Sequence, residues 1–452
     1  MKMSKLGGLV LVWLCLTARA NAGITVLLEE PYSYDGAFAG TGHTAVYLTR
    51  VCAASPTVLR RCYPGEAGVV ISRYNRIAGY DWIAIPLLPY LYALAQPEEI
   101  PLYADPKLVA FLRDQYRQQY LEEFAPEKAP GEIPAGDWVQ LIGSAYDRTS
   151  YGFQIETTSE QDDALIRWLN TRPNAKSYKV VSRNCADFVR EVVNFYYPKA
   201  VSRGIFSDLD VATPKQTAKS FVKYSERHSD LEFSSFVIPQ VPGTIKRSRP
   251  VRGVVESVFK AKKYVIPLAV FHPFLAGGVA SVFLVGGRFN PAKNALVFNP
   301  EGDAEQPLTE EERREYHKKL EDLWRTASEE EPSHKPSSWR EFQRVAKPGF
   351  DLFGRPILRS ATAYGPVSLG ISRSNLLSNA GPSGLQCEFL VARLRQVLTA
   401  GRAPRSSSIG VRHDMELLQK LVAAQREGVT ATASIGDRGR QTPSNQLLAD
   451  QQ

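Results

Sequence analysis

The stretch Tyr178-Lys-Val-Val-Ser-Arg-Asn-Cys-Ala-Asp-Phe-Val-Arg-Glu-Val-Val-Asn194 carries the pattern that decides the fold. Residues 178–181 are mostly apolar and are typical of a short extended run. The pattern changes after Asn184, because Phe188 and Val192 are spaced to lie on one buried face of a helix. We therefore predict that an extended segment passes into a helix at this point.

The residues at that junction suggest a reactive thiol. Asn184 is a residue type that caps helices, which places Cys185 in the first helical turn. Free backbone N–H groups and the positive end of the helix dipole favour a thiolate there. Cys185 is therefore a candidate nucleophile, and its own N–H could stabilise an oxyanion. The alternative is a buried structural cysteine, since cysteine is among the most interior residue types.

The N-terminus has the pattern of a secretory signal peptide. Two lysines precede an apolar run at residues 6–16, and residues 20–22 (Ala-Asn-Ala) fit a small-x-small cleavage site. We expect residues 1–22 to be removed and the protein to be exported, to the periplasm, the cell envelope or a membrane surface. An uncleaved anchor is the alternative interpretation.

The composition and net charge of the chain indicate its possible size of core and its possible binding partners. The chain has 452 residues, of which 44% are apolar, so it can bury at least one large core and has room for a second region. Its formal net charge is +8. Because we expect export, this charge suits an anionic surface such as phospholipid or cell-wall polymer better than nucleic acid.

Removal of the signal peptide leaves four cysteines. Cys52 and Cys62 are close in sequence, with a turn-prone Ser-Pro pair between them. In an oxidising compartment we expect these two to form a disulfide. Cys387 is then the only other possible partner for Cys185.

The order of the apolar patterns predicts an α+β fold. Expected strands lie at 24–28, 42–48, 68–74, 138–142 and 151–155, and expected helices lie at 106–123, 158–170 and 214–225. The second and third strands flank the cysteine pair, so an antiparallel arrangement is the simplest. We assign residues 23–240 to this domain.

The remainder of the chain differs in composition. Residues 241–263 form a basic linker, which is either solvated or in contact with a membrane surface. Residues 264–287 are apolar and long enough to span a bilayer, although a buried or re-entrant hairpin would also fit. Residues 288–452 are expected to be a charged region of helices and disorder.

His43 is the candidate base. It stands at the entrance of the strand expected at 42–48 and is the only histidine before residue 200. Paired with Cys185, it could take the thiol proton while the sulfur attacks a carbonyl carbon. A lone histidine on a strand can also be purely structural.

Two short motifs now resemble a known group of enzymes. The motifs are Gly42-His43-Thr44-Ala45-Val46-Tyr47-Leu48 and Asn184-Cys185-Ala186-Asp187-Phe188-Val189. They resemble the circularly permuted papain-like hydrolases, which include permuted NlpC-type and lecithin–retinol acyltransferase-like proteins, over residues 23–200. The resemblance implies an antiparallel sheet and a helix that carries the nucleophile. It implies cysteine-dependent hydrolysis or acyl transfer on peptides, other amides or lipid esters.

That group places a third polar residue on the strand after the histidine. If Thr49 faces Val69 across the loop, His43 faces Asn75, whose carboxamide could orient the imidazole. A shift of two or three residues admits Ser72 or Tyr74 instead. The alternative is that these side chains are ordinary polar residues at a strand end. The lecithin–retinol group usually has a second histidine here, which this chain lacks.

The sequence thus predicts an exported thiol hydrolase that cleaves an amide or ester bond in an envelope peptide or lipid. The alternative is a non-catalytic envelope protein that retains the fold for binding or structure. We expect no cofactor or metal, because the histidines show no zinc-ligand spacing and there is no phosphate loop. Membrane contact is possible through residues 246–287. A low thiol pKa at Cys185 would favour the enzyme, and an inert buried thiol would favour the binding protein.

Overall fold

The strand β1 (Gly23–Glu29) lies in the middle of a seven-stranded sheet, and each of its residues is buried. The computed structural model describes residues 23–32, 41–75, 77–175, 178–204, 208, 210–254, 256–257, 262–286, 288–329, 339–362, 365–376, 383–399 and 406–438. The predicted signal peptide, residues 1–22, therefore lies outside the described residues.

The strand order in this sheet is β6-β5-β2-β1-β7-β8-β9. All neighbours are antiparallel except β8 and β9, which run parallel. The other strands are β2 (His43–Leu48), β5 (Val69–Ser72), β6 (Ile83–Pro86), β7 (Ser150–Glu156), β8 (Ser234–Ile238) and β9 (Leu296–Val297). This arrangement confirms the α+β class and the antiparallel pairing of the second and third predicted strands.

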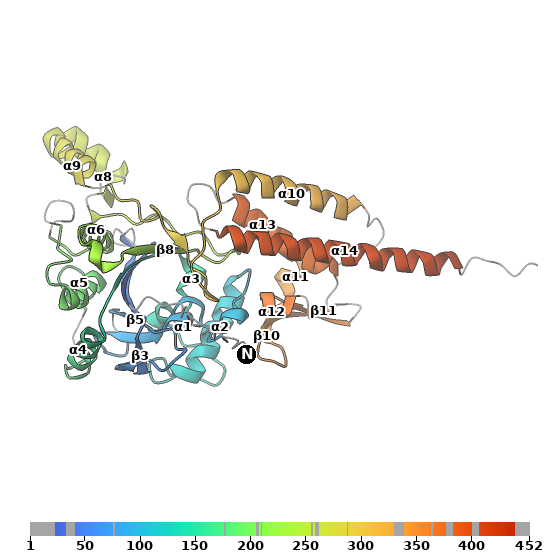
Figure 1. Ribbon diagram of the computed structural model, residues 1–452, viewed down its shortest axis with the longest axis horizontal. Coiled ribbons are helices and arrows are strands. Elements are labelled where there is room, and N and C mark those ends of the chain that lie inside the picture. The colour runs from blue at the N-terminus through green and yellow to red at the C-terminus, as the bar shows by residue number, and fades with distance from the viewer. Residues whose placement is uncertain are drawn as a thin grey trace, which may run out of the picture.

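One face of the sheet is covered by α4 (Ser159–Asn170), α5 (Cys185–Tyr196) and α6 (Pro214–Ser225). Figure 1 shows these three helices stacked along the same side of the sheet. Side chains of alternate strand residues, such as Val26 and Val46, form one core with Phe188 of α5. Residues on a strand alternate between faces, so the intervening residues point to the other side.

The opposite face is covered in part by the C-terminal region. A second core contains Leu27 and Ala45 of the sheet together with Phe389, Leu394 and Leu418. It also includes residues of α1 (Leu87–Tyr92), α2 (Pro106–Tyr120) and α3 (Ser144–Asp147). The two parts of the chain therefore share one hydrophobic core.

The C-terminal region contains a small sheet as well as helices. Figure 1 shows α10, α13 and α14 running beside one another at the end of the molecule opposite α4 and α5. Its strands, in the order β10-β11-β12, are Lys347–Phe350, Pro356–Thr362 and Gly365–Gly370. Its helices are α10 (Glu310–Glu329), α11 (Trp339–Val345), α12 (Arg373–Leu376), α13 (Ser383–Thr399) and α14 (Ser408–Arg438). The expectation of helices and disorder alone missed this sheet.

The strand expected at 138–142 is instead the 3-10 helix η3 (Asp137–Leu141). Trp138 and Leu141 are three residues apart and both are buried, so a helical turn places both in the core. Two glycines with positive φ, Gly136 and Gly143, bracket the segment. Among the described residues, two further short 3-10 helices are η2 (Pro97–Glu99) and η4 (Ser229–Leu231).

The extended run expected at 178–181 is also wrong. Lys179 and Arg183 form an isolated antiparallel bridge, and the residues between them make a tight turn. Val180 and Val181 are 47% and 58% exposed, so their β-branched side chains pack into no sheet. Local propensity predicted a strand here, but no neighbouring strand is available to pair with it.

The register between β2 and β5 differs by one residue from the expected one. Leu48, rather than Thr49, lies opposite Val69. Gly68, with φ of +81°, approaches the Leu48 carbonyl so closely that a Cβ would lie 2.2 Å from its oxygen. The Thr49 N–H instead donates to the Gly23 carbonyl (3.2 Å). The chain between β2 and β5 forms a separate hairpin, β3 (Val51–Ser55) and β4 (Val58–Arg61).

The apolar segment at 264–287 is divided between two helices, α8 (Lys262–Phe271) and α9 (Pro273–Gly286). Pro273 lacks an N–H and cannot continue the preceding helix, so the break falls at His272. Within the described residues, no helix has both the length and the apolar character needed to cross a bilayer.

Candidate functional site

The N-terminus of α5 is fixed by a reciprocal capping box, which confirms Asn184 as the N-cap. The Asn184 side chain accepts a hydrogen bond from the Asp187 N–H (3.0 Å), and the Asp187 carboxylate accepts one from the Asn184 N–H (3.3 Å). The Asn184 amide also donates to the carbonyls of Val180 and Ala212. Cys185 is therefore the first residue of a firmly held helix.

The Cys185 thiol is buried, with 6% of the residue exposed. Burial raises the pKa of the Cys185 thiol to about 11, and the negative charge of Glu29 adds to this effect. The backbone N–H groups of Thr44, Ala186 and Cys185 itself interact with the sulfur and lower the pKa, but they do not offset burial. The thiol is therefore protonated at neutral pH, whereas the sequence suggested a thiolate.

His43 begins β2 and its ring is held by two neighbours. Its Nε2 lies 2.7 Å from the Ser72 hydroxyl, and its ring stacks on Tyr74 with centroids 4.9 Å apart. The Ser72 hydroxyl donates its proton to the Thr44 carbonyl (3.3 Å), which can only accept. When this proton is directed to Thr44, Ser72 accepts from Nε2–H of His43, and the lone pair of the neutral ring then lies on Nδ1.

The charge state of His43 is set by its surroundings. Burial lowers the pKa of the His43 imidazole well below its usual value, and the nearby positive charge of Arg148 lowers it further. The ring is therefore neutral at neutral pH. A neutral imidazole can accept a proton but cannot form a resting ion pair with a thiolate.

The structure brings His43 together with Ser72 and Tyr74. The register of β2 and β5, continued to the strand end, places Tyr74 opposite His43. Asn75, the residue first expected to orient the imidazole, is exposed at the surface. A register shift of one residue moves a side chain to the other face, which explains the difference.

His43 and Cys185 approach the end of β2 from opposite faces. His43 shares a face with Ala45 and with Glu29, its partner across β1. The helix of Cys185 packs on the other face, where Val46 lies. The sulfur interacts with the N–H of Thr44, the residue that follows His43. Among the described residues, no hydrogen bond joins the imidazole to the sulfur.

A buried ion pair beside His43 was missed by sequence reasoning. Arg148 and Glu29 lie 2.9 Å apart, both almost fully buried, although the two atoms are not aligned as a hydrogen bond. Tyr90 donates to the other Glu29 oxygen (2.5 Å). The sequence signal was available, because two glutamates end an apolar strand and buried carboxylates need partners. No sequence signal identified Arg148 as the partner of Glu29, because the two residues lie far apart in the chain.

A groove runs along the outer side of α5 and has a volume of about 890 Å³. Its charged lining includes Arg73, Lys179, Arg183, Arg190, Asp187 and Glu191. The buried guanidinium of Arg73 forms two hydrogen bonds with Asp81 (2.8 and 2.9 Å). Arg73 also donates to the Asn184 carbonyl (3.4 Å), so the wall of the groove supports the start of α5.

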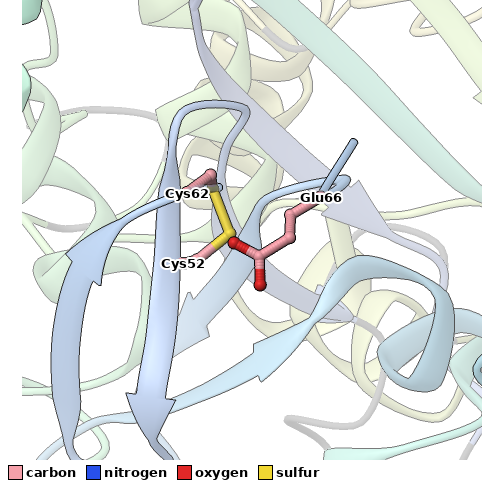
Figure 2. Close-up of side chains that lie close together, drawn as sticks. All are labelled: Cys52, Cys62 and Glu66. Carbon is pink, nitrogen blue, oxygen red and sulfur yellow. A yellow bond between two sulfur atoms is a disulfide. The ribbon is translucent and has the colours of Figure 1, made fainter. Parts of the chain in front are cut away.

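The predicted disulfide between Cys52 and Cys62 is present in the β3–β4 hairpin. Figure 2 shows the Glu66 side chain directed toward the bonded sulfurs. The three groups are close enough to resemble a metal site, but the sulfurs are bonded to each other and offer no thiolate. Arg60 instead binds Glu66 through two hydrogen bonds of 2.7 Å. Cys185 and Cys387 are both buried and lie outside this disulfide.

Comparisons with known proteins give little further information. No protein-family model matches the chain, and a search of curated proteins finds no match. A search of solved structures finds similarity to the crystal structure of a type VI secretion system effector, TseH. The two sequences are 13% identical, and the similarity covers 45% of this chain and 90% of that chain with a TM-score of 0.22. A likeness this weak carries no argument about function.

Proposed function

We propose that the protein is an exported thiol hydrolase that cleaves an amide or ester bond, with Cys185 as nucleophile and His43 as base. The observation that carries the proposal is the position of the Cys185 sulfur. It lies at the start of a capped helix and close to the backbone N–H of Thr44, the residue that follows His43 in β2. A nucleophile and a base at one strand end are the minimum for acyl transfer.

The resting pair is neutral, so the proton moves during attack. The Cys185 sulfur bonds to the carbonyl carbon while its proton passes to Nδ1 of His43, which requires the ring to swing within hydrogen-bond reach of the sulfur. Backbone N–H groups at the start of α5 stabilise the oxyanion. His43 then protonates the departing amine or alcohol. Water cleaves the thioester, its proton passing to His43, and the sulfur regains a proton.

Ser72 has a positioning role in this scheme. In the resting protein it accepts from Nε2–H and so selects the tautomer whose Nδ1 can take a proton once the ring has swung toward the sulfur. Envelope peptides and lipid esters both contain a suitable carbonyl, and they remain the two candidate substrates. Export would bring the enzyme to either of them.

A second candidate function is favoured by one observation. The Cys185 thiol is buried, and burial raises its pKa to about 11. A cysteine with such a pKa stays protonated at neutral pH and is unreactive. On this reading the protein is an envelope binding or structural protein that retains a hydrolase-like arrangement without catalysis.

Alkylation by iodoacetamide separates the two candidates, because the chain has an internal control. Cys387 is likewise a thiol outside the disulfide, and it is 1% exposed. If the protein is a hydrolase, Cys185 reacts faster than Cys387 at pH 7.5, and His43→Ala slows only Cys185. The hydrolysis of p-nitrophenyl butyrate should be abolished by Cys185→Ser and by His43→Ala. Equal slow alkylation of both cysteines, unchanged in His43→Ala, would support the binding protein.

A further inference from the structure

The hairpin formed by α8 and α9 exposes large apolar side chains where the two helices meet. Phe271 is 73% exposed and Phe274 is 96% exposed. On α8, Ile266 and Val270 are 59% and 67% exposed. Soluble proteins rarely leave neighbouring large apolar groups in water unless the surface binds something.

The hairpin is placed so that a large flat surface could approach it. The two helices pack against each other. Figure 1 shows them at a corner of the molecule, beyond α6 and at the far side from α10, α13 and α14. The hairpin therefore lies at the edge of the molecule, away from the C-terminal helices.

The charged residues within and next to the hairpin in the sequence are basic. Residues 257–300 contain no aspartate or glutamate. They contain the basic residues Lys260, Lys262, Lys263, Arg288 and Lys293. Of these, Arg288 and Lys293 follow α9 and are exposed. An apolar tip followed by exposed basic residues is the pattern of segments that rest in the interface of an anionic membrane.

We propose that the α8–α9 hairpin inserts its tip into one leaflet of a membrane that contains anionic lipids. Phe271 and Phe274 then lie among the acyl chains of that leaflet, and Arg288 and Lys293, which follow the other end of α9, contact lipid phosphates. The basic residues favour an anionic membrane over an apolar protein groove as the partner of the hairpin. Lipid phosphates offer these residues opposite charge, whereas an apolar groove does not. The proposal does not depend on the proposed hydrolase activity.

Vesicle binding by the full chain tests the proposal. We expect co-sedimentation with phosphatidylcholine vesicles that contain about 30% phosphatidylserine, and weaker binding to phosphatidylcholine alone. The double variant Phe271→Ser, Phe274→Ser should lower the partition coefficient roughly 100-fold, about tenfold for each ring. The double variant Arg288→Glu, Lys293→Glu should reduce binding only to the anionic vesicles, and added salt should have the same effect.

The C-terminal region supplies a matched control. Leu352 and Phe353 lie in the turn between β10 and β11 and are 100% and 78% exposed. The variant Leu352→Ser, Phe353→Ser removes as much exposed apolar surface elsewhere and should bind vesicles like the parent protein. The proposal is overturned if the parent does not bind anionic vesicles, or if the control variant loses as much binding as the hairpin variant. It is also overturned if the hairpin variant only changes the oligomeric state, which would make the tip a contact between two copies.

Discussion

At the scale of single residues, the candidate base is held by contacts that a sequence can only partly foresee. The pairing of a histidine at a strand start with a cysteine at a helix start could be proposed from residue types alone. The choice among Ser72, Tyr74 and Asn75 depended on the register between β2 and β5. The observed register differs by one residue from the one expected from the sequence. The pair Glu29–Arg148 could not be found, because it joins two segments that meet only in the folded sheet.

The variant Ser72→Ala tests the role of this hydroxyl. It removes the acceptor for Nε2–H of His43, and loss of one neutral hydrogen bond, ~1 kcal/mol, corresponds to a roughly five- to tenfold lower kcat. We expect this fall in p-nitrophenyl butyrate hydrolysis with little change in KM. Asn75→Ala is the control, and because Asn75 is exposed we expect activity within about twofold of the parent. Equal effects of the two variants would show that Ser72 does not position the ring.

The buried thiol also predicts a dependence of stability on pH. The pKa of Cys185 is raised from 9.0 to about 11 in the folded protein, so the folded state keeps a proton that the unfolded chain loses. This contribution is complete below pH 9 and is lost as pH rises through 11, a change of about 3 kcal/mol. Because serine does not titrate, the difference in unfolding free energy between the parent and Cys185→Ser should change by this amount over that window. The difference is measured by urea denaturation of both proteins. The same difference at pH 8.5 and at pH 11 would contradict the assignment.

At the scale of elements, prediction succeeded where the signals were local. The capping boxes of α4 and α5 join residues three positions apart, so sequence alone locates both helix starts. Prediction failed at residues 138–142 and 178–181, where apolar side chains were assigned to strands. Whether such a run becomes a strand depends on a neighbouring strand to pair with, which local sequence does not reveal.

The capping box of α5 predicts a specific loss of reactivity. Asn184→Ala removes the cap and two further hydrogen bonds and should lower the unfolding free energy by about 1–2 kcal/mol. Thr158→Ala removes the corresponding cap of α4 at a similar cost of ~1 kcal/mol. Only Asn184→Ala should change the alkylation rate of Cys185, because only that helix positions the sulfur. The same change of rate in both variants would indicate a general loss of stability instead.

At the scale of the whole molecule, the chain is held together by a core that spans its two parts. The composition of residues 288–452 suggested charged helices and disorder, and it hid the apolar side chains that pack on the sheet. The assignment failed because those side chains are spread over several helices and form one cluster only in three dimensions. The parallel strand β9 adds a second connection, since it joins the main sheet after α9.

The shared core predicts that damage in the C-terminal region reaches the N-terminal sheet. Phe389 is fully buried, and Phe389→Ala should cost about 3–5 kcal/mol of unfolding free energy. Hydrogen exchange followed by mass spectrometry should then show faster exchange in β2 as well as in α13. Phe353→Ala, at an exposed position, should change neither. Unchanged protection of β2 in Phe389→Ala would mean that the two parts unfold independently.

The shared core also sets an order of events during synthesis. The ribosome releases β1 and β2 long before α13, so the face of the sheet that carries Leu27 and Ala45 exists first without the part of its cover that the C-terminal region supplies. The other face is covered mainly by α4 to α6 and can close earlier, as can the β3–β4 hairpin with its disulfide. We therefore expect a nascent chain that stops before α13 to be retained by a chaperone that recognises apolar segments, and the finished chain to be released.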